Sequence, residues 1–429
     1  MIKKFIDQIR SGFIKLKDPR NGKNSSYDFV DVAIAGYSIF HMQSPSILAH
    51  QERLTKLHGE HNGHTLFGFK KIPSDNQIRN LLDSVETKDI EPIFDDIHSN
   101  IDTRDFMCEG GLVVAIDGVH FFSSEKVSCS CCLIKQSGKV TKYQHAMLVP
   151  ALIHPEQKCA LPMAPEFISN QDGFEKQDCE VNSAKRWCNA KNNWLTNNKV
   201  TLLGDDLFSR KPLIEQLVSY KNVRFIFVAK PTSHKYMFEW IDGYESDDIE
   251  TCFVTEKQGA KKHIFQYRIY NKIPLTGDVN SPEVNYFEMT VTDGKGKKIY
   301  YNTFVTNHLI NKSNIHNIAR MGRNRWRIEN EAFNILKTKG YNLEHNFGHG
   351  KKNLSNILAC FNLLAFLVHY LSEITSDLYR EVRNCFGARI RFFQALAFTF
   401  TLQIWDSWDT LLKFTLEISR PRLRGRRSN

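Results

Sequence analysis

Three short apolar runs in the middle of the chain constrain its fold more than any other feature. GLVVAID (111–117), VTLLGD (200–205) and VRFIFVAK (223–230) have the length of β-strands and do not alternate with polar residues. Such runs are typical of strands that are buried on both faces. Helix-like segments lie between them at 183–195 and 210–220. The sequence therefore predicts an α/β fold built on a largely buried sheet.

The segments on either side of these runs have different patterns. Residues 236–311 alternate between apolar and polar positions, are rich in β-branched and aromatic residues, and contain the turn signal DGKGKK. Helical periodicity dominates the N-terminal part and returns at 313–340. We therefore expect five parts: a helical N-terminal region (1–105), the first part of an α/β domain (106–235), a β-rich insertion (236–311), a helical C-terminal region (312–416) and a basic tail (417–429).

The most apolar stretch, NILACFNLLAFLVHYL (356–371), is short for a membrane span and contains Asn362 and His369. We interpret it as a core helix. The N-terminus has no apolar run of signal-peptide length, and ten cysteines in 429 residues are too sparse for a disulfide scaffold. A cytoplasmic protein with reduced thiols and no membrane partner is expected.

The charge balance favours a polyanionic partner. Lys and Arg number 57 against 47 Asp and Glu, which gives a formal net charge of +10. Basic side chains crowd one predicted helix beside Trp326, and these are Arg320, Arg323, Arg325 and Arg327. Basic residues next to an aromatic ring suit phosphate contact and base stacking, although a solvated basic face is the alternative. Nucleic acid is therefore the expected partner.

Acidic residues occupy three positions where chemistry is expected. Asp117 and Asp205 each close an apolar run, at the edge of the sheet where α/β folds place ligands. Glu329 lies beside the apolar stripe of the 313–340 helix. A turn or capping role is the simpler explanation for either aspartate alone. Together, two aspartates and a glutamate provide the hard oxygen ligands that two Mg²⁺ ions need to cleave a phosphodiester.

The order of these motifs carries a family resemblance. VVAIDG, LLGDD, a β-rich stretch and RWRIEN on a helix follow one another, and the sequence resembles DDE transposases of the IS4-like group of bacterial insertion sequences. The segments 165–187 and 337–350 are also similar to those of such transposases. The resemblance implies an RNase H-like catalytic core with the β-rich insertion between its second aspartate and its glutamate. It also implies that Asp117, Asp205 and Glu329 are catalytic and bind two Mg²⁺, for which Mn²⁺ often substitutes.

The signature of this group is Tyr, two residues, Arg, three residues, Glu, six residues, Lys. Arg325 and Glu329 match its Arg and Glu, but Gly322 stands at the Tyr position and Leu336 at the Lys position. Lys337 lies one residue late. The resemblance implies that Arg325 and Lys337 contact DNA phosphates, and the departures place this chain in a divergent branch.

The activity implied is that of a transposase. Such an enzyme binds double-stranded DNA at the terminal inverted repeats of its element, cuts to expose a 3′ hydroxyl, and joins that hydroxyl to target DNA. Trp326 would stack on a base, or would be a core tryptophan. Residues 1–105 are the expected DNA-binding region, and a homodimer is expected because two ends are cut together. A metal-dependent nuclease on the same fold and an inactive DNA-binding regulator are the alternatives.

Two acidic assignments stay open. Asp206 could replace Asp205, although the strand ends more naturally at Asp205. Glu331 could replace Glu329, but the two residues lie about 200° apart around a helix, so only one of them can face the metal ions.

A second group of residues could bind a metal. Three or four of the following could ligate Zn²⁺, and ordinary thiols are the alternative: Cys129, Cys131, Cys132, His145, His154 and Cys159. His345 and His349 have a metal-binding spacing only on a helix, and nearby glycines favour a loop, where Lys351 and Lys352 could touch DNA. Lys176 lies in a polar segment that either contacts DNA or is a solvated turn.

Overall fold

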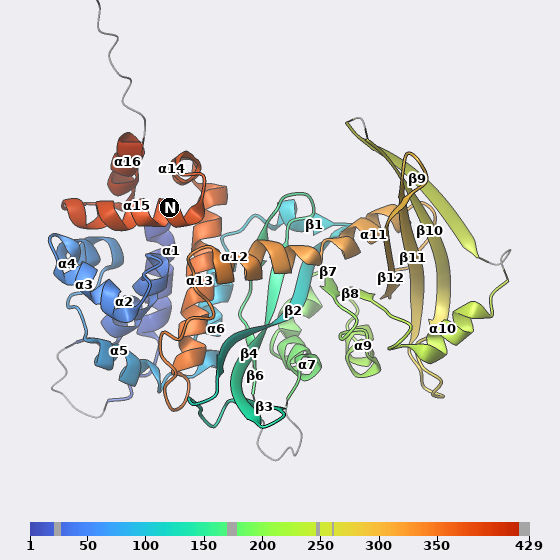
Figure 1. The fold of residues 1–429 in the computed structure, drawn as a ribbon, viewed down its shortest axis with the longest axis horizontal. Helices are drawn as coiled ribbons and strands as arrows, with labels where there is room; N and C mark the ends of the chain where they lie inside the picture. The colour runs from blue at the N-terminus through green and yellow to red at the C-terminus, as the bar shows by residue number, and fades with distance from the viewer. Residues whose placement is uncertain (21–26, 170–177, 246–248, 260, 420–429) are drawn as a thin grey trace, which may run out of the picture.

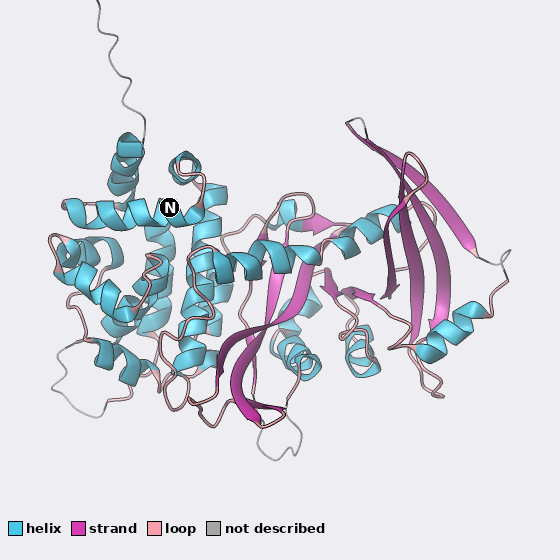
Figure 2. Ribbon diagram, in the orientation of Figure 1, coloured by secondary structure: helices cyan, strands magenta, loops and turns pink. Residues whose placement is uncertain are grey.

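A single mixed sheet runs through most of the molecule in the computed structural model (Figures 1 and 2). The structure describes residues 1–20, 27–169, 178–245, 249–259 and 261–419. Hydrogen-bonded neighbours follow the order β3-β4-β2-β7-β8-β12-β11-β10-β9. The strands are β1 (Met107–Cys108), β2 (Gly111–Ser124), β3 (Leu133–Ser137), β4 (Val140–Ile153), β5 (Ala160–Pro162), β6 (Glu166–Ile168), β7 (Val200–Gly204), β8 (Val223–Val228), β9 (Glu250–Gln258), β10 (Lys261–Pro274), β11 (Glu283–Asp293) and β12 (Lys298–Thr306).

The three apolar runs form the centre of this sheet, as predicted. β7 is parallel to β2, with Ala115 opposite Leu203, and β8 is parallel to β7. β4 is antiparallel to β2 on the other side. The connections between the parallel strands contain α7 (Glu180–Ala190), α8 (Asn192–Asn197) and α9 (Lys211–Val218). The α/β class is therefore confirmed, with the sheet mixed rather than purely parallel.

The predicted β-rich segment extends the same sheet and does not form a sheet of its own. After α10 (Lys235–Asp242), strands β9 to β12 pair antiparallel in a row, and β12 then pairs with β8. The DGKGKK turn joins β11 to β12, and the Asp293 carboxylate accepts from the amides of Lys295 and Lys297. Pairing with β12 satisfies the edge that β8 would otherwise expose.

The helices from the two ends of the chain form one body at the opposite end of the molecule from β9–β12 (Figure 1). The N-terminal members are α1 (Ile2–Ile14), α2 (Phe29–His41), α3 (Ile47–Thr55), α4 (Gly59–Asn62), η1 (Gly63–Phe67), α5 (Asp75–Leu82), η2 (Thr87–Asp89) and α6 (Glu91–His98), whereas η3 (Thr103–Phe106) lies beside β1 and contacts β2. The C-terminal members are α13 (Leu354–Thr375), α14 (Asp377–Cys385), α15 (Arg389–Leu402) and α16 (Trp408–Ser419). Residues 1–105 therefore share a core with the C-terminal helices.

α13 is the centre of this body. It is the one helix of the described residues that is long and apolar enough to cross a membrane, and 89% of its most apolar window is buried inside the protein. The amide of Asn362 donates to the carbonyl of Tyr341, and His369 is bonded to the hydroxyl of the same tyrosine. The prediction of a core helix is confirmed.

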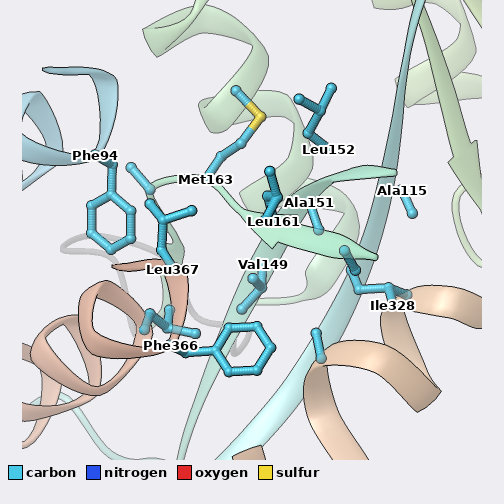
Figure 3. Close-up of a cluster of buried hydrophobic side chains, with 14 of the residues drawn as sticks. Phe94, Ala115, Val149, Ala151, Leu152, Leu161, Met163, Ile328, Phe366 and Leu367 are labelled. Atoms are coloured by element: carbon cyan, nitrogen blue, oxygen red, sulfur yellow. The ribbon is translucent and has the colours of Figure 1, made fainter. Parts of the chain in front are cut away.

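One apolar cluster joins the helical body to the sheet (Figure 3). Phe366 and Leu367 of α13 lie beside Val149 of β4 and Leu161 of β5, and Ile328 completes the cluster. Each side chain is almost completely buried, which stabilises the fold by about 1.5–3 kcal/mol per residue. The segment that carries Glu329 therefore packs against both the helical body and the sheet.

The helix predicted at 313–340 is interrupted. α11 (Ile315–Arg323) ends in a turn at 324–325, a π-helix η5 (Ile328–Phe333) follows, and α12 (Asn334–Thr338) ends the segment. The sequence predicts an apolar stripe of Met321, Ile328, Ala332 and Ile335. The first three residues are buried, but Ile335 is only partly buried and its neighbour Leu336 is fully buried instead. A π-turn takes about one residue more than an α-turn, which explains the shift. In the predicted basic tail, 417–419 belong to α16, and 420–429 lie outside the described residues.

Candidate active site

Asp117 lies in β2 directly after the buried half of that strand. Its Oδ1 accepts a 2.9 Å hydrogen bond from the amide of Gly118. Burial raises the pKa of Asp117 to about 7, the positive charge of Arg325 opposes this shift, and the charges of Glu329 and Asp205 add to it. The three predicted carboxylates therefore lie within electrostatic range of one another. Such a crowd of carboxylates is stabilised by a cation.

Arg325 links two of these carboxylates. Its Nη1 lies 3.5 Å from Oδ2 of Asp117 and 2.8 Å from Oε1 of Glu329. The carboxylate of Glu329 is about half exposed, with 51% of its side chain accessible, whereas the Asp117 side chain is 16% accessible. The interrupted helix therefore presents Glu329 to the strand that carries Asp117, as η5 packs directly against β2.

Asp205 follows β7, the parallel neighbour of β2. Its Oδ1 accepts a 2.9 Å bond from the amide of Leu207, so the carboxylate is held in the turn that follows the strand. Asp117 lies within β2, which continues to Ser124, and not at a strand end as predicted. In the parallel pair, Ala115 of β2 lies opposite Leu203 of β7, so Asp117 and Asp205 each lie two residues beyond the same paired position. The geometry therefore brings Asp117, Asp205 and Glu329 together.

The alternative acidic residues have other partners. The carboxylate of Asp206 accepts a 2.7 Å bond from the amide of Lys230 and a bond from the hydroxyl of Ser233, so it ties the ends of β7 and β8 together. The charge of Glu331 acts on Arg327, and its carbonyl accepts from the hydroxyl of Tyr370 at 3.3 Å. The geometry favours Asp205 and Glu329 as the members of the site.

Glu180 is a fourth carboxylate that the sequence analysis missed. It begins α7, and its carboxylate lies against the backbone of β2 at Gly118, where an added Cβ would lie 2.3 Å from Oε1 and the Glu180 side chain would have to move. Burial raises the pKa of Glu180, and the charge of Asp205 adds to that shift. The signal was its position inside the family-like segment 165–187.

The predicted basic helix face is divided between different roles. Arg327 is buried, and its guanidinium donates to the carbonyls of His154, Glu156 and Gln157, so it holds the turn after β4. Arg323 lies over the ring of Tyr300, with 4.6 Å from the guanidinium carbon to the ring centroid. The expectation of one continuous basic surface is therefore wrong for Arg327, because burial commits it to backbone carbonyls.

A surface groove lies along this segment. Its lining consists of Pro155, Glu156, Arg320, Arg323, Asn324, Trp326 and Arg327. Trp326 is 37% exposed, which excludes the fully buried core tryptophan and leaves one part of its ring accessible. The groove combines an exposed aromatic ring with basic side chains, which is a combination that nucleic acids can use.

Lys337 lies in α12, where its Nζ is 2.7 Å from Oε1 of Glu344. Burial lowers the pKa of His120 in β2, and the charges of Lys135 and Lys337 lower it further, so Lys337 lies near the strand that carries Asp117. An uninterrupted α-helix would turn Lys337 away from the helix face that carries Glu329. The π-helix adds about one residue to the helical repeat, which brings Lys337 closer to that face.

The second predicted metal group is brought together only in part. Cys129, Cys132 and His145 gather with His349, which the sequence analysis placed in a DNA-contacting loop. Cys131 and Cys159 lie outside this group. His154 also lies outside it, since its Nδ1 accepts from the amides of Glu156 and Gln157.

The remaining loop predictions have mixed outcomes. The amides of Lys351 and Lys352 donate to the carboxylate of Asp83, which fixes the backbone of this loop. His345 packs against Phe347 and does not pair with His349. Lys176 lies outside the described residues.

The side chains at the sheet edge match the donor chemistry of a divalent cation site. Oxygen ligands from carboxylates are those that Mg²⁺ prefers, and Asp117, Asp205 and Glu329 would supply them. Among the described residues, the Cys/His group alone already has its ligand atoms close enough together to hold a metal ion. Neither the models of known protein families nor the curated protein sequences give a match to this chain.

Proposed function

We propose that this chain is a DDE transposase that cleaves and joins DNA with the help of two Mg²⁺ ions, for which Mn²⁺ may substitute. The observation that carries the proposal is the convergence of Asp117, Asp205 and Glu329 from three separate segments at one edge of the sheet. A turn role for each aspartate would not require the other two residues nearby.

The topology supports an RNase H-like core as part of this proposal. β2 and β4 form an antiparallel pair, and β7 and β8 then run parallel to β2 with helices in the connections. Strands β9 to β12 lie in sequence between Asp205 and Glu329, where the family resemblance expects an insertion. The interrupted helix then returns Glu329 to the core.

In this proposal the residues divide the work by their positions. Asp117 and Asp205 would hold the cations from two neighbouring strands, and Glu329 would add a carboxylate from the π-helix. When bound, two Mg²⁺ ions polarise the scissile phosphate and stabilise the attacking and leaving oxygens. Arg325 neutralises Asp117 and Glu329 in the absence of cations, and it is placed to hold a phosphate oxygen when they are present.

The DNA partner follows from charge and surface chemistry. The net charge of +10 favours a polyanion, and the groove at Trp326 lies on the same interrupted helix as Glu329. In a DNA complex, Lys337 would leave its ion pair with Glu344 and contact a phosphate instead. We propose that the combined helical body recognises the terminal inverted repeats, and that a homodimer in the cytoplasm cuts both ends before joining them to target DNA.

The test is a cleavage assay on labelled DNA that carries the ends flanking the coding region. Wild type is compared with Asp117→Asn, Asp205→Asn and Glu329→Gln, and Glu331→Gln is the matched control on the same π-helix. The proposal expects Mg²⁺-dependent cuts and joined products from wild type and from the control alone, with DNA binding retained by all. Cleavage without joined products would identify a nuclease. Binding without cleavage in Mg²⁺ or Mn²⁺ would identify a DNA-binding regulator.

A further inference from the structure

We propose that Cys129, Cys132, His145 and His349 bind one structural Zn²⁺ ion. The proposal is independent of the transposase function, because none of these residues belongs to the carboxylate site. Two of them lie in the segment between β2 and β3, His145 lies in β4, and His349 lies in the loop before α13. They come from distant parts of the chain, since Cys132 and His349 are separated by 217 residues.

The distances between the ligand atoms support the proposal. The two Sγ atoms lie 3.7 Å apart, and Nε2 of His145 lies 3.5 Å from Sγ of Cys129 and 3.4 Å from Sγ of Cys132. Nε2 of His349 lies 3.7 Å from Sγ of Cys132. All four ligand atoms lie within 4.8 Å of one another.

These values can be compared with a tetrahedral zinc site. With Zn–S bonds of about 2.3 Å and Zn–N bonds of about 2.0–2.1 Å, tetrahedral angles give S–S separations of about 3.8 Å and S–N separations of about 3.5 Å. The four observed distances agree with these values to about 0.2 Å. Each distance alone also fits a hydrogen bond of a thiol, and the convergence of four ligand atoms within 4.8 Å of one another is what points to a metal ion.

The composition and burial of the group indicate a structural role. Four protein ligands leave no open coordination position, whereas catalytic zinc keeps one for water or substrate. Cys132 and His145 are each 2% exposed and His349 is 7% exposed. Cys129 and Cys132 have the C-x₂-C spacing that frequently supplies two zinc ligands from one turn.

Aromatic rings form the shell around the group. The ring of Phe122 lies 4.4 Å from that of His349 and 5.6 Å from that of His145, measured between centroids. The Phe121 ring lies 5.7 Å from the His145 ring. Such an apolar shell excludes water and fixes the orientation of the imidazoles. Both phenylalanines belong to β2, so the group is built on the strand that carries Asp117.

The position of the group explains what the ion would do. The loop that carries His349 is tied on its other side to α5, because the carboxylate of Asp83 accepts 3.0 Å bonds from the amides of Lys351, Lys352 and Leu354. A zinc ion would tie the same loop to the sheet. It would therefore join the helical body to the far end of β2 and β4.

The experiment measures metal in the full-length protein purified from zinc-containing medium. We expect one equivalent of zinc per chain in wild type, and we expect Cys132→Ser and His349→Gln to lose it. Cys131→Ser is the matched control, since this neighbouring thiol lies outside the group, and it should keep one equivalent. Zinc-depleted wild type given Co²⁺ alone should show the intense visible absorption of a tetrahedral site together with a thiolate-to-cobalt charge-transfer band.

A second measurement keeps the proposal testable if a ligand variant fails to fold. Titration of folded wild type with a mercurial should release zinc to a coloured chelator in proportion to the thiols modified. The proposal is overturned if wild type contains well below one equivalent and gives no tetrahedral cobalt spectrum. It is also overturned if Cys131→Ser loses the metal, or if mass spectrometry finds Cys129 and Cys132 joined as a disulfide in place of the metal.

Discussion

The carboxylate site and the Cys/His group use the same strand in different ways. Asp117, near the middle of β2, lies within electrostatic range of Asp205 and Glu329, and Arg325 offsets part of their mutual repulsion. Phe122, five residues further on, packs against a closed and buried set of soft ligands. Unrelieved charge at an accessible edge is typical of a site that binds a ligand, whereas a closed and buried set is typical of one that holds the fold together.

The largest expected effect tests the carboxylate side of this comparison. Glu329→Gln should reduce Mg²⁺-dependent DNA cleavage by about 10⁴-fold or more, because residues that act as one catalytic unit fail together when one is lost. Glu331→Gln should stay within about tenfold of wild type, because its charge faces Arg327. Single-turnover cleavage rates measure both. Equal losses in the two variants would show that the π-helix presents the other glutamate.

The next effect tests the Cys/His side. Cys132→Ser should lower the free energy of unfolding by about 4 kcal/mol or more, since the loss of a structural metal is among the largest single-residue effects. Denaturant unfolding followed by far-UV circular dichroism measures it. Cys131→Ser, which leaves the group intact, should stay within about 0.5 kcal/mol of wild type. A stability of Cys132→Ser equal to that of this control would remove the structural role.

The two sites also differ in what the sequence could predict. Asp117 and Asp205 could be predicted to lie close together, because the apolar runs before them indicate neighbouring buried strands. Residues that follow such strands lie at the same end of the sheet. Glu180 was not predicted, although its carboxylate lies against the backbone of β2 at Gly118. That contact depends on how α7 packs against β2, and no local pattern records it.

The Cys/His group illustrates the same limit. Cys129 and Cys132 have C-x₂-C spacing, but the sequence analysis overlooked it because Cys131 lies between them, and it predicted only a looser set that included His154 and Cys159. His349 is 217 residues from Cys132, and only the packing of the helical body on the sheet brings them together. The π-helix at Glu329 was missed for a similar reason, because the sequence shows helical periodicity without the inserted residue that tertiary packing accommodates.

A third prediction uses the raised pKa of Asp117. Its carboxyl group titrates near pH 7 in the folded chain and near its ordinary value of 3.8 when unfolded. Between these values the folded chain binds more protons, so the free energy of unfolding should fall as pH rises from about 4 to about 7. The shift corresponds to about 4 kcal/mol, and Asp117→Asn should remove that part of the pH dependence. Parallel stability curves for the two proteins, measured without divalent cations, would contradict this account.

The smallest expected effect concerns DNA contact beside the carboxylate site. Trp326 is partly exposed in the groove with Arg320 and Arg323, and stacking of one base on an aromatic ring contributes about 1–3 kcal/mol. Trp326→Ala should therefore weaken binding to DNA ends by about 5- to 150-fold, measured by fluorescence anisotropy at fixed salt. Trp240→Ala is the control, because Trp240 is 48% exposed on α10, next to the β9–β12 part of the sheet. If both substitutions weaken binding equally, the groove has no special role, and contact with DNA is spread over the basic surface. If Trp326→Ala alone weakens it, the interrupted helix both carries a carboxylate of the site and holds the DNA beside it.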